Sequence, residues 1–204
     1  MKKSLIILVL FSIPFLSIGQ KLIHECDELK VGIYKNFNEF KTNSPSIEFN
    51  YQVICDTIRY KIPSTRKRLV RYKIDIDKKT SKTIGNVFGF CDGKHVYIND
   101  KNPRLRPRTN FSRIERLAPY CYFVVLDKAY MRGGGQYGGS FISFVSEKLV
   151  NIDTGEILDF TRRNLREEIL VHHEELLHAF DNEKKYRPWL LMKYYLKYLE
   201  ELKE

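Results

Sequence analysis

The chain has no apolar stretch of membrane-spanning length beyond its first twenty residues, so we expect no transmembrane segment in the processed protein. Its four cysteines form neither a CxxC pair nor the Cys/His spacing that is typical of a zinc site. A GxSxG nucleophile elbow and the sequences that flank catalytic cysteines are missing too. The sequence therefore offers no cofactor, no metal ligand and no catalytic residue to name.

The first nineteen residues have the layout of a bacterial secretory signal peptide. Lys2 and Lys3 form a short positive region, an apolar run follows over residues 5–16, and a segment of small residues ends at Gly19. This layout predicts cleavage between Gly19 and Gln20. Gln20 also stands where a lipoprotein would carry its modified cysteine, so we expect a periplasmic or secreted protein that is not a lipoprotein. Export would exclude nucleic acid as a partner.

Residues 20–204 are expected to form a single globular domain, because 43% hydrophobic and 13% aromatic residues indicate a packed core. Of the 35 basic residues, Lys2 and Lys3 leave with the signal peptide, so 33 remain against 25 acidic residues, a net charge of +8. Such an excess keeps a protein soluble, or it favours binding to anionic surfaces.

The cysteines are Cys26, Cys55, Cys91 and Cys121. An even number in an oxidising compartment permits disulfides, with three possible connectivities, while a domain of this size can equally keep buried free thiols. Their pairing stays open at this point.

Alternation of apolar and polar residues predicts β structure over most of residues 20–160. The alternation from Ile47 to Tyr60 predicts a half-buried strand with Cys55 on its buried face. Asp92-Gly93 lies between two apolar runs and is typical of a two-residue type I′ β-hairpin turn. Asp153-Thr154-Gly155 predicts another turn, with Gly155 at its left-handed position.

Residues 161–204 have a helical pattern instead. Thr161 is suited to a helix N-cap, and Pro188 is suited to the first turn of a last helix that carries Leu191, Tyr195 and Tyr198 on one face. The sequence thus predicts an α+β fold of about seven antiparallel strands in a twisted sheet or partly closed barrel, with C-terminal helices packed on it.

Three motifs suggest chemistry that their context does not favour. Residues 133–138 satisfy GxGxxG, but the residues that follow favour a strand over the helix that a dinucleotide site needs. Residues 153–155 match the Asp-Thr-Gly of aspartic proteases, which need two such carboxylates. His173 and His178 are five residues apart, so one helical turn does not bring them together as it does in HExxH.

Two basic stretches remain. One runs from Arg59 to Lys73 without an acidic residue and contains Arg66, Lys67, Arg68 and Arg71; the other includes Lys101, Arg104, Arg106 and Arg108. In an exported protein they are solvated loops or a contact for an anionic surface such as lipopolysaccharide or acidic glycan. Arg66, Lys67, Arg68 and Arg71 are our candidate contact residues.

Several strings of residues carry a resemblance: GIYKNFNEFK (32–41) with Ser44-Pro45, GFCDGK (89–94), IERL (114–117), YCYF (120–123), DTGE (153–156) and Asn164-Leu165. In these strings the chain resembles a family of uncharacterised exported proteins of Gram-negative bacteria, a domain of unknown function. The resemblance implies one exported domain, β-rich with a helical C-terminal end, and it brings no catalytic residue.

Together these observations favour a non-catalytic binding or interaction domain of the cell envelope. Its partner would be an anionic envelope component or another envelope protein. The alternative is a small extracytoplasmic hydrolase with a site that only the fold assembles. A concave pocket that holds a nucleophile, a base and an oxyanion site would favour the hydrolase.

Overall fold

The computed structural model describes residues 21–62, 67–99, 106–131 and 140–203. The predicted signal peptide with its cleavage point at Gly19 and Gln20, the GxGxxG segment 133–138, and the basic residues Arg66, Lys101 and Arg104 lie outside the described residues.

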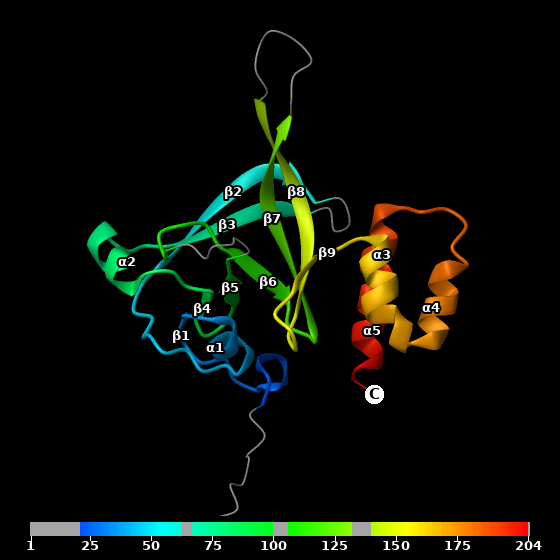
Figure 1. Cartoon of the computed structure of the whole chain (residues 1–204), viewed down its shortest axis with the longest axis horizontal. Helices are drawn as coiled ribbons and strands as arrows, with labels where there is room; N and C mark the ends of the chain where they lie inside the picture. Colours follow the sequence, from blue (N-terminus) through cyan, green and yellow to red (C-terminus); the bar gives the residue numbers. More distant parts are fainter. Residues whose placement is uncertain (1–20, 63–66, 100–105, 132–139, 204) are drawn as a thin grey trace, which may run out of the picture.

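Seven strands form one open antiparallel sheet in the order β1-β4-β5-β6-β7-β8-β9. Their bounds are β1 Gly32–Tyr34, β4 Gly89–Cys91, β5 Val96–Ile98, β6 Ser112–Arg116, β7 Tyr120–Met131, β8 Ser140–Asn151 and β9 Ile157–Asp159. A separate two-stranded sheet pairs β2 (Val53–Lys61) with β3 (Arg68–Ile74). In Figure 1 this pair crosses the long β7–β8 hairpin, and the sheet does not close into a barrel. The predicted α+β class is confirmed.

The helices lie mainly after the last strand, beside β9 in Figure 1. They are α1 (Phe37–Lys41), α2 (Lys78–Ile84), α3 (Arg162–Asn164), α4 (Glu174–Asp181) and α5 (Pro188–Glu201), with a π turn over Leu165–Ile169 and a 3-10 turn over Leu170–His172. Another 3-10 turn spans Ile23–Glu25. None of the helices in the described ranges is long and apolar enough to cross a membrane.

Local capping signals explain where these helices begin. The Thr161 hydroxyl accepts a hydrogen bond from the Asn164 N–H at 3.2 Å, and Pro188 occupies the first turn of α5. Both predictions are confirmed. The sequence reading missed α2, although Asp77 caps it by accepting from two backbone N–H groups.

Three apolar clusters stabilise the fold. One lies between the sheet and the C-terminal helices and includes Tyr122, Leu149, Leu165 and Tyr195. The second covers the other face, with Tyr34, Phe88, Phe123 and Val150. The third joins β3 to β4 and β5 through a stack of Phe49, Phe90 and Tyr97, with Tyr72 and Phe111 beside it.

Helix α1 connects the two ends of the open sheet. It follows the edge strand β1, yet its Phe37 ring lies against Gly155 in the turn between β8 and the other edge strand, β9. Lys41 Nζ donates to the Asp153 carbonyl in the same turn at 3.0 Å. The sheet therefore curves until a helix bridges its edges, although β1 and β9 do not pair.

Two turn predictions had different outcomes. Gly155 has a φ of +77°, as predicted, and Asn151 anchors its turn by accepting from the Asp153 N–H at 2.7 Å. The hairpin at Asp92-Gly93 forms, but a two-residue type I′ turn is wrong: Cys91 pairs with Val96 across a four-residue connection. Asp92 Oδ1 accepts from the backbone N–H groups of the two residues that follow Gly93, at 2.9 and 2.7 Å. Gly93 has the predicted positive φ, at +92°, but Asp92 does not, so the Asp92 side chain and Gly93 together set the turn.

The predicted strand from Ile47 to Tyr60 is also corrected. Ordered pairing begins only at Val53, while Ile47 makes one isolated bridge to Ile33. Cys55 is exposed and not buried, because β2 pairs with β3 alone and lies at the edge of the small sheet. All four cysteines are free: Cys91 and Cys121 are buried and Cys26 is half-buried.

Candidate anion-binding cleft

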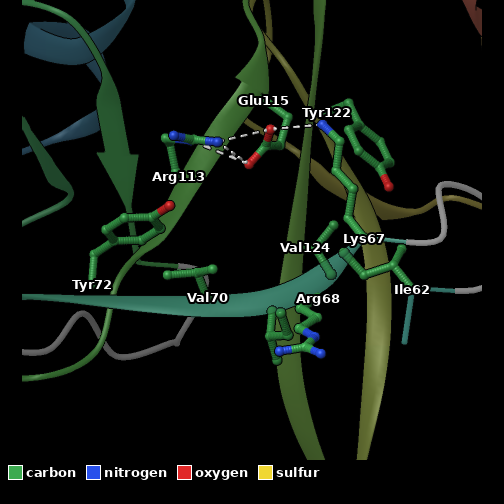
Figure 2. A pocket seen from close by; sticks show the side chains of 10 residues that line it. Ile62, Lys67, Arg68, Val70, Tyr72, Arg113, Glu115, Tyr122 and Val124 are labelled. Carbon is green, nitrogen blue, oxygen red and sulfur yellow. Dashed lines mark hydrogen bonds and ion pairs between the residues drawn. The ribbon is translucent and has the colours of Figure 1, made fainter. Parts of the chain in front are cut away.

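A cleft of about 230 Å³ opens where β3 passes β6 and β7 (Figure 2). Three parts of the chain line it: the two ends of the β2–β3 connection together with β3, then β6, then β7. The lining residues are Ile62, Lys67, Arg68, Leu69, Val70, Tyr72, Arg113, Glu115, Tyr122 and Val124. In Figure 2 Arg113, Glu115 and the end of the Lys67 side chain lie together on one side of the apolar Val70 and Val124, and Arg68 lies on the other side.

The alternation of β6 brings the two charged groups of the cleft together. Arg113 and Glu115 are two residues apart, so both point to the face of the cleft, while Ile114 between them is buried in the opposite cluster. The Arg113 guanidinium holds the Glu115 carboxylate with three contacts of 2.9–3.2 Å. Such a fork is geometrically specific, so it fixes both side chains.

Lys67 reaches the same carboxylate from the β2–β3 connection. Its Nζ lies 3.4 Å from Glu115 Oε2, and its side chain is 58% exposed against 22% for Glu115. Burial opposes the charge of Arg113, but the hydrogen bonds and charge of Glu115 outweigh it and raise the pKa of the guanidinium. Arg113 therefore stays charged at neutral pH.

Two tyrosines also line the cleft. The Arg113 guanidinium carbon lies 5.7 Å from the centre of the Tyr72 ring, within the range of a cation–π contact. Burial raises the pKa of the Tyr72 phenol, and Arg113 offsets this only in part. On β7 the Tyr122 hydroxyl lies 2.5 Å from a carboxylate oxygen of Glu147.

The lining carries three cations against one carboxylate. Lys67, Arg68 and Arg113 oppose Glu115, which gives a local charge of +2. Figure 2 shows Arg68 directed away from Glu115, so its charge lies on the outer side of the cleft. Ligand pockets commonly measure about 300–1,000 Å³. A cleft of about 230 Å³ suits one charged group at the end of a larger ligand and does not enclose a whole substrate.

The structure separates the basic residues that the sequence singled out. Lys67 and Arg68 line the cleft. Arg71 is held by Asp56 at 2.9 Å and does not line it, and Arg66 lies outside the described residues. In the second basic stretch, Arg106 and Arg108 are exposed to solvent, and neither lines the cleft.

The other two charged residues of the cleft, Arg113 and Glu115, were not predicted from the sequence. Arg113 and Glu115 could have been found from their i, i+2 spacing within a predicted strand, which places opposite charges on one face. Tyr72 and Tyr122 gave no signal of their own, since aromatic residues in strands are usual core residues.

The lining set named above contains no Ser, Cys or His, so it holds no nucleophile–base pair of the usual kinds. The histidines make contacts elsewhere: His173 Nδ1 lies 2.6 Å from a Glu201 carboxylate oxygen, and His178 lies beside Asn182. Within the described ranges no three His, Cys, Asp or Glu residues are arranged to hold a metal ion. The charged groups of the cleft are those that can bind and orient an anion.

Comparison with protein families matches residues 32–204 to a family of unknown function, DUF6563. The chain belongs to this family. The match spans β1 to α5 and so includes every strand and residue of the cleft. No curated protein and no solved structure matches the chain. Membership in a family of unknown function agrees with the resemblance in the sequence, whereas export and a Gram-negative origin stay predictions.

Proposed function

We propose that this protein is an exported, non-catalytic binding domain that holds an anionic component of the cell envelope at the cleft between β3, β6 and β7. The observation that carries the proposal is the pair of cations fixed on Glu115, with Arg68 beside them on the outer side. Because Glu115 and Tyr72 hold Arg113 in place, little side-chain entropy is lost when an anion binds.

The proposed ligand is a phosphate or carboxylate group displayed on a larger molecule, such as the anionic sugars of lipopolysaccharide. The small volume of the cleft admits such a group, and the net charge of its lining attracts it.

The test is co-sedimentation with phosphatidylcholine vesicles that contain lipopolysaccharide. The variant Lys67→Ser/Arg68→Ser should lose binding, and wild-type binding should fall steeply with salt, since screening shortens from about 8 Å at physiological ionic strength to about 3 Å at 1 M. The matched control is Lys78→Ser/Lys79→Ser, which removes the same charge from exposed positions on α2. An equal loss of vesicle binding in both variants would mean that only the overall charge of the protein matters, and it would overturn the assignment of the cleft.

Export is tested separately. Mass spectrometry of the protein from its native host should give a mature N-terminus at Gln20. Mature protein that starts at Met1 would contradict the proposed localisation and leave the cleft proposal without an envelope ligand. The hydrolase alternative predicts turnover of envelope glycans or esters that is lost in an active-site variant; turnover that depends on Tyr122 or Glu147 would favour it over simple binding.

A further inference from the structure

The β7–β8 hairpin extends beyond the rest of the main sheet (Figure 1). Its strands pair without a register shift from Tyr120 opposite Asn151 to Met131 opposite Ser140. The neighbour β9 pairs with β8 only over Lys148–Val150. Among the described residues no strand pairs with the outer edge of β8 over residues 140–146, which we call the β8 edge.

The two faces of this hairpin differ. On one face Val145 and Leu126 pack into the cluster that includes Leu69 of β3, so the small sheet covers it. On the other face Ile142 and Phe144 are 43% and 41% exposed. An exposed edge with exposed apolar side chains is a template for pairing with another strand.

The sequence of the β8 edge is nearly symmetric about its centre. It reads Ser-Phe-Ile-Ser-Phe-Val-Ser, with no charged residue and no proline. The free strand β2 differs, since it carries Asp56, Arg59 and Lys61, charges of the kind that protect natural edges. The β8 edge lacks this protection.

We propose that the β8 edge pairs antiparallel with the β8 edge of a second copy of this chain, about a two-fold axis through Ser143. In this register Ser143 faces its own copy and Ile142 faces Phe144. Directly opposed side chains in such a pair have Cβ atoms about 4.5–5.5 Å apart. The exposed Ile142 and Phe144 of both copies then form one apolar cluster on a single face.

The backbone direction supports this register. The Glu147 carbonyl accepts from Phe160 and the Asn151 N–H donates to Glu156, so odd-numbered residues of β8 point their polar backbone groups away from β7. Because β8 pairs with β7 without a register shift, this alternation of backbone direction continues along the strand. Ser143 and Val145 therefore have their N–H and C=O groups at the outer edge of β8. An axis at Ser143 therefore gives a hydrogen-bonded pair at the centre, as an antiparallel ladder permits.

Such a contact is small compared with standard interfaces, so we expect a dimer that dissociates on dilution. Sedimentation velocity over a concentration series tests it. The wild type should show a monomer–dimer equilibrium, Ser143→Lys should be monomeric because two like charges would face each other, and Ile142→Lys should dissociate at higher concentration. The matched control Ile54→Lys, at a position 46% exposed on β2, should dimerise like the wild type. A monomeric wild type, or a Ser143→Lys variant that dimerises normally, would overturn the proposal.

A cysteine scan tests the register itself, in a Cys55→Ser background because Cys55 is exposed. Ser143→Cys should form an intermolecular disulfide under mild oxidation, since hydrogen-bonded antiparallel pairs place Cα atoms about 5.5 Å apart. Ser146→Cys should not, because its copy would lie about 20 Å away along the strands. Equal cross-linking of both variants would contradict an axis at Ser143.

Discussion

Gly155 is the point where α1 bridges the edges of the sheet, and Gly155→Ala tests that bridge. The residue has a φ of +77°, and a Cβ there would lie 2.8–2.9 Å from three carbons of the Phe37 ring. The left-handed conformation costs alanine about 1–2 kcal/mol, and overpacking a close contact costs about 1–3 kcal/mol. The unfolding free energy should therefore fall by about 2–5 kcal/mol.

Thermal denaturation followed by circular dichroism measures this loss. For a chain of this length about 1 kcal/mol lowers the Tm by roughly 2–4 °C, so we expect a decrease of roughly 4–20 °C. A double-mutant cycle with Phe37→Ala separates the two causes. Removing the ring should relieve the clash but not the backbone strain, so the two changes together should cost about 1–3 kcal/mol less than their sum.

A Gly155→Ala variant whose unfolding free energy lies within about 0.5 kcal/mol of the wild type, the range of ordinary surface substitutions, would refute both the strain and the clash at this turn. A cycle without coupling would place the whole cost in the backbone. In that case α1 would not bridge the sheet edges through Phe37.

Three further predictions concern other parts of the fold. Burial opposes ionisation of Asp92, but hydrogen bonds from the hairpin backbone outweigh it and lower the pKa of the carboxyl. The ionised Asp92 therefore stabilises the fold above the unfolded pKa of about 3.9, and this stabilisation is lost as the pH falls through the folded pKa. Asp92→Asn should flatten this acid limb in urea titrations below about pH 4; an unchanged slope would refute it. Alkylation followed by mass spectrometry should modify the exposed Cys55 quickly, while Cys121, whose pKa burial raises to about 12, should react only on unfolding; equal rates would contradict the packing. Tyr195→Phe should cost about 1–3 kcal/mol in denaturant unfolding, because it removes a 2.5 Å hydrogen bond to the Tyr120 carbonyl, and a neutral result would mean that water replaces the hydroxyl.

Features that depend on neighbouring residues could be predicted from the sequence. The cap at Thr161, the first turn at Pro188 and the left-handed Gly155 each follow from local backbone chemistry, and the structure contains all three. The Asp92-Gly93 turn failed although it is local, because the Asp92 side chain competes with the backbone for the N–H groups of the turn.

Features that depend on distant neighbours could not be predicted. Cys55 alternates with apolar residues as a buried thiol would, yet it is exposed, since the number of strands that flank β2 is a tertiary property. The run of basic residues drew attention to Lys67 and Arg68, but Glu115 comes from β6 of the other sheet, and only the packing of the two sheets brings it to Lys67. The sequence predicted the basic residues Lys67 and Arg68 of the cleft, but it did not predict which residues of other strands they would meet.

Hydrogen–deuterium exchange on the protein bound to lipopolysaccharide vesicles tests the central proposal most directly, because it locates the contact on the chain. We predict that bound vesicles slow exchange at the start of β3, near Lys67 and Arg68, and along β6 around Arg113. Exchange in α2 and α5 should stay as it is in the free protein. Protection that falls on the helices and leaves β3 and β6 unchanged would contradict an anion-binding cleft between these strands.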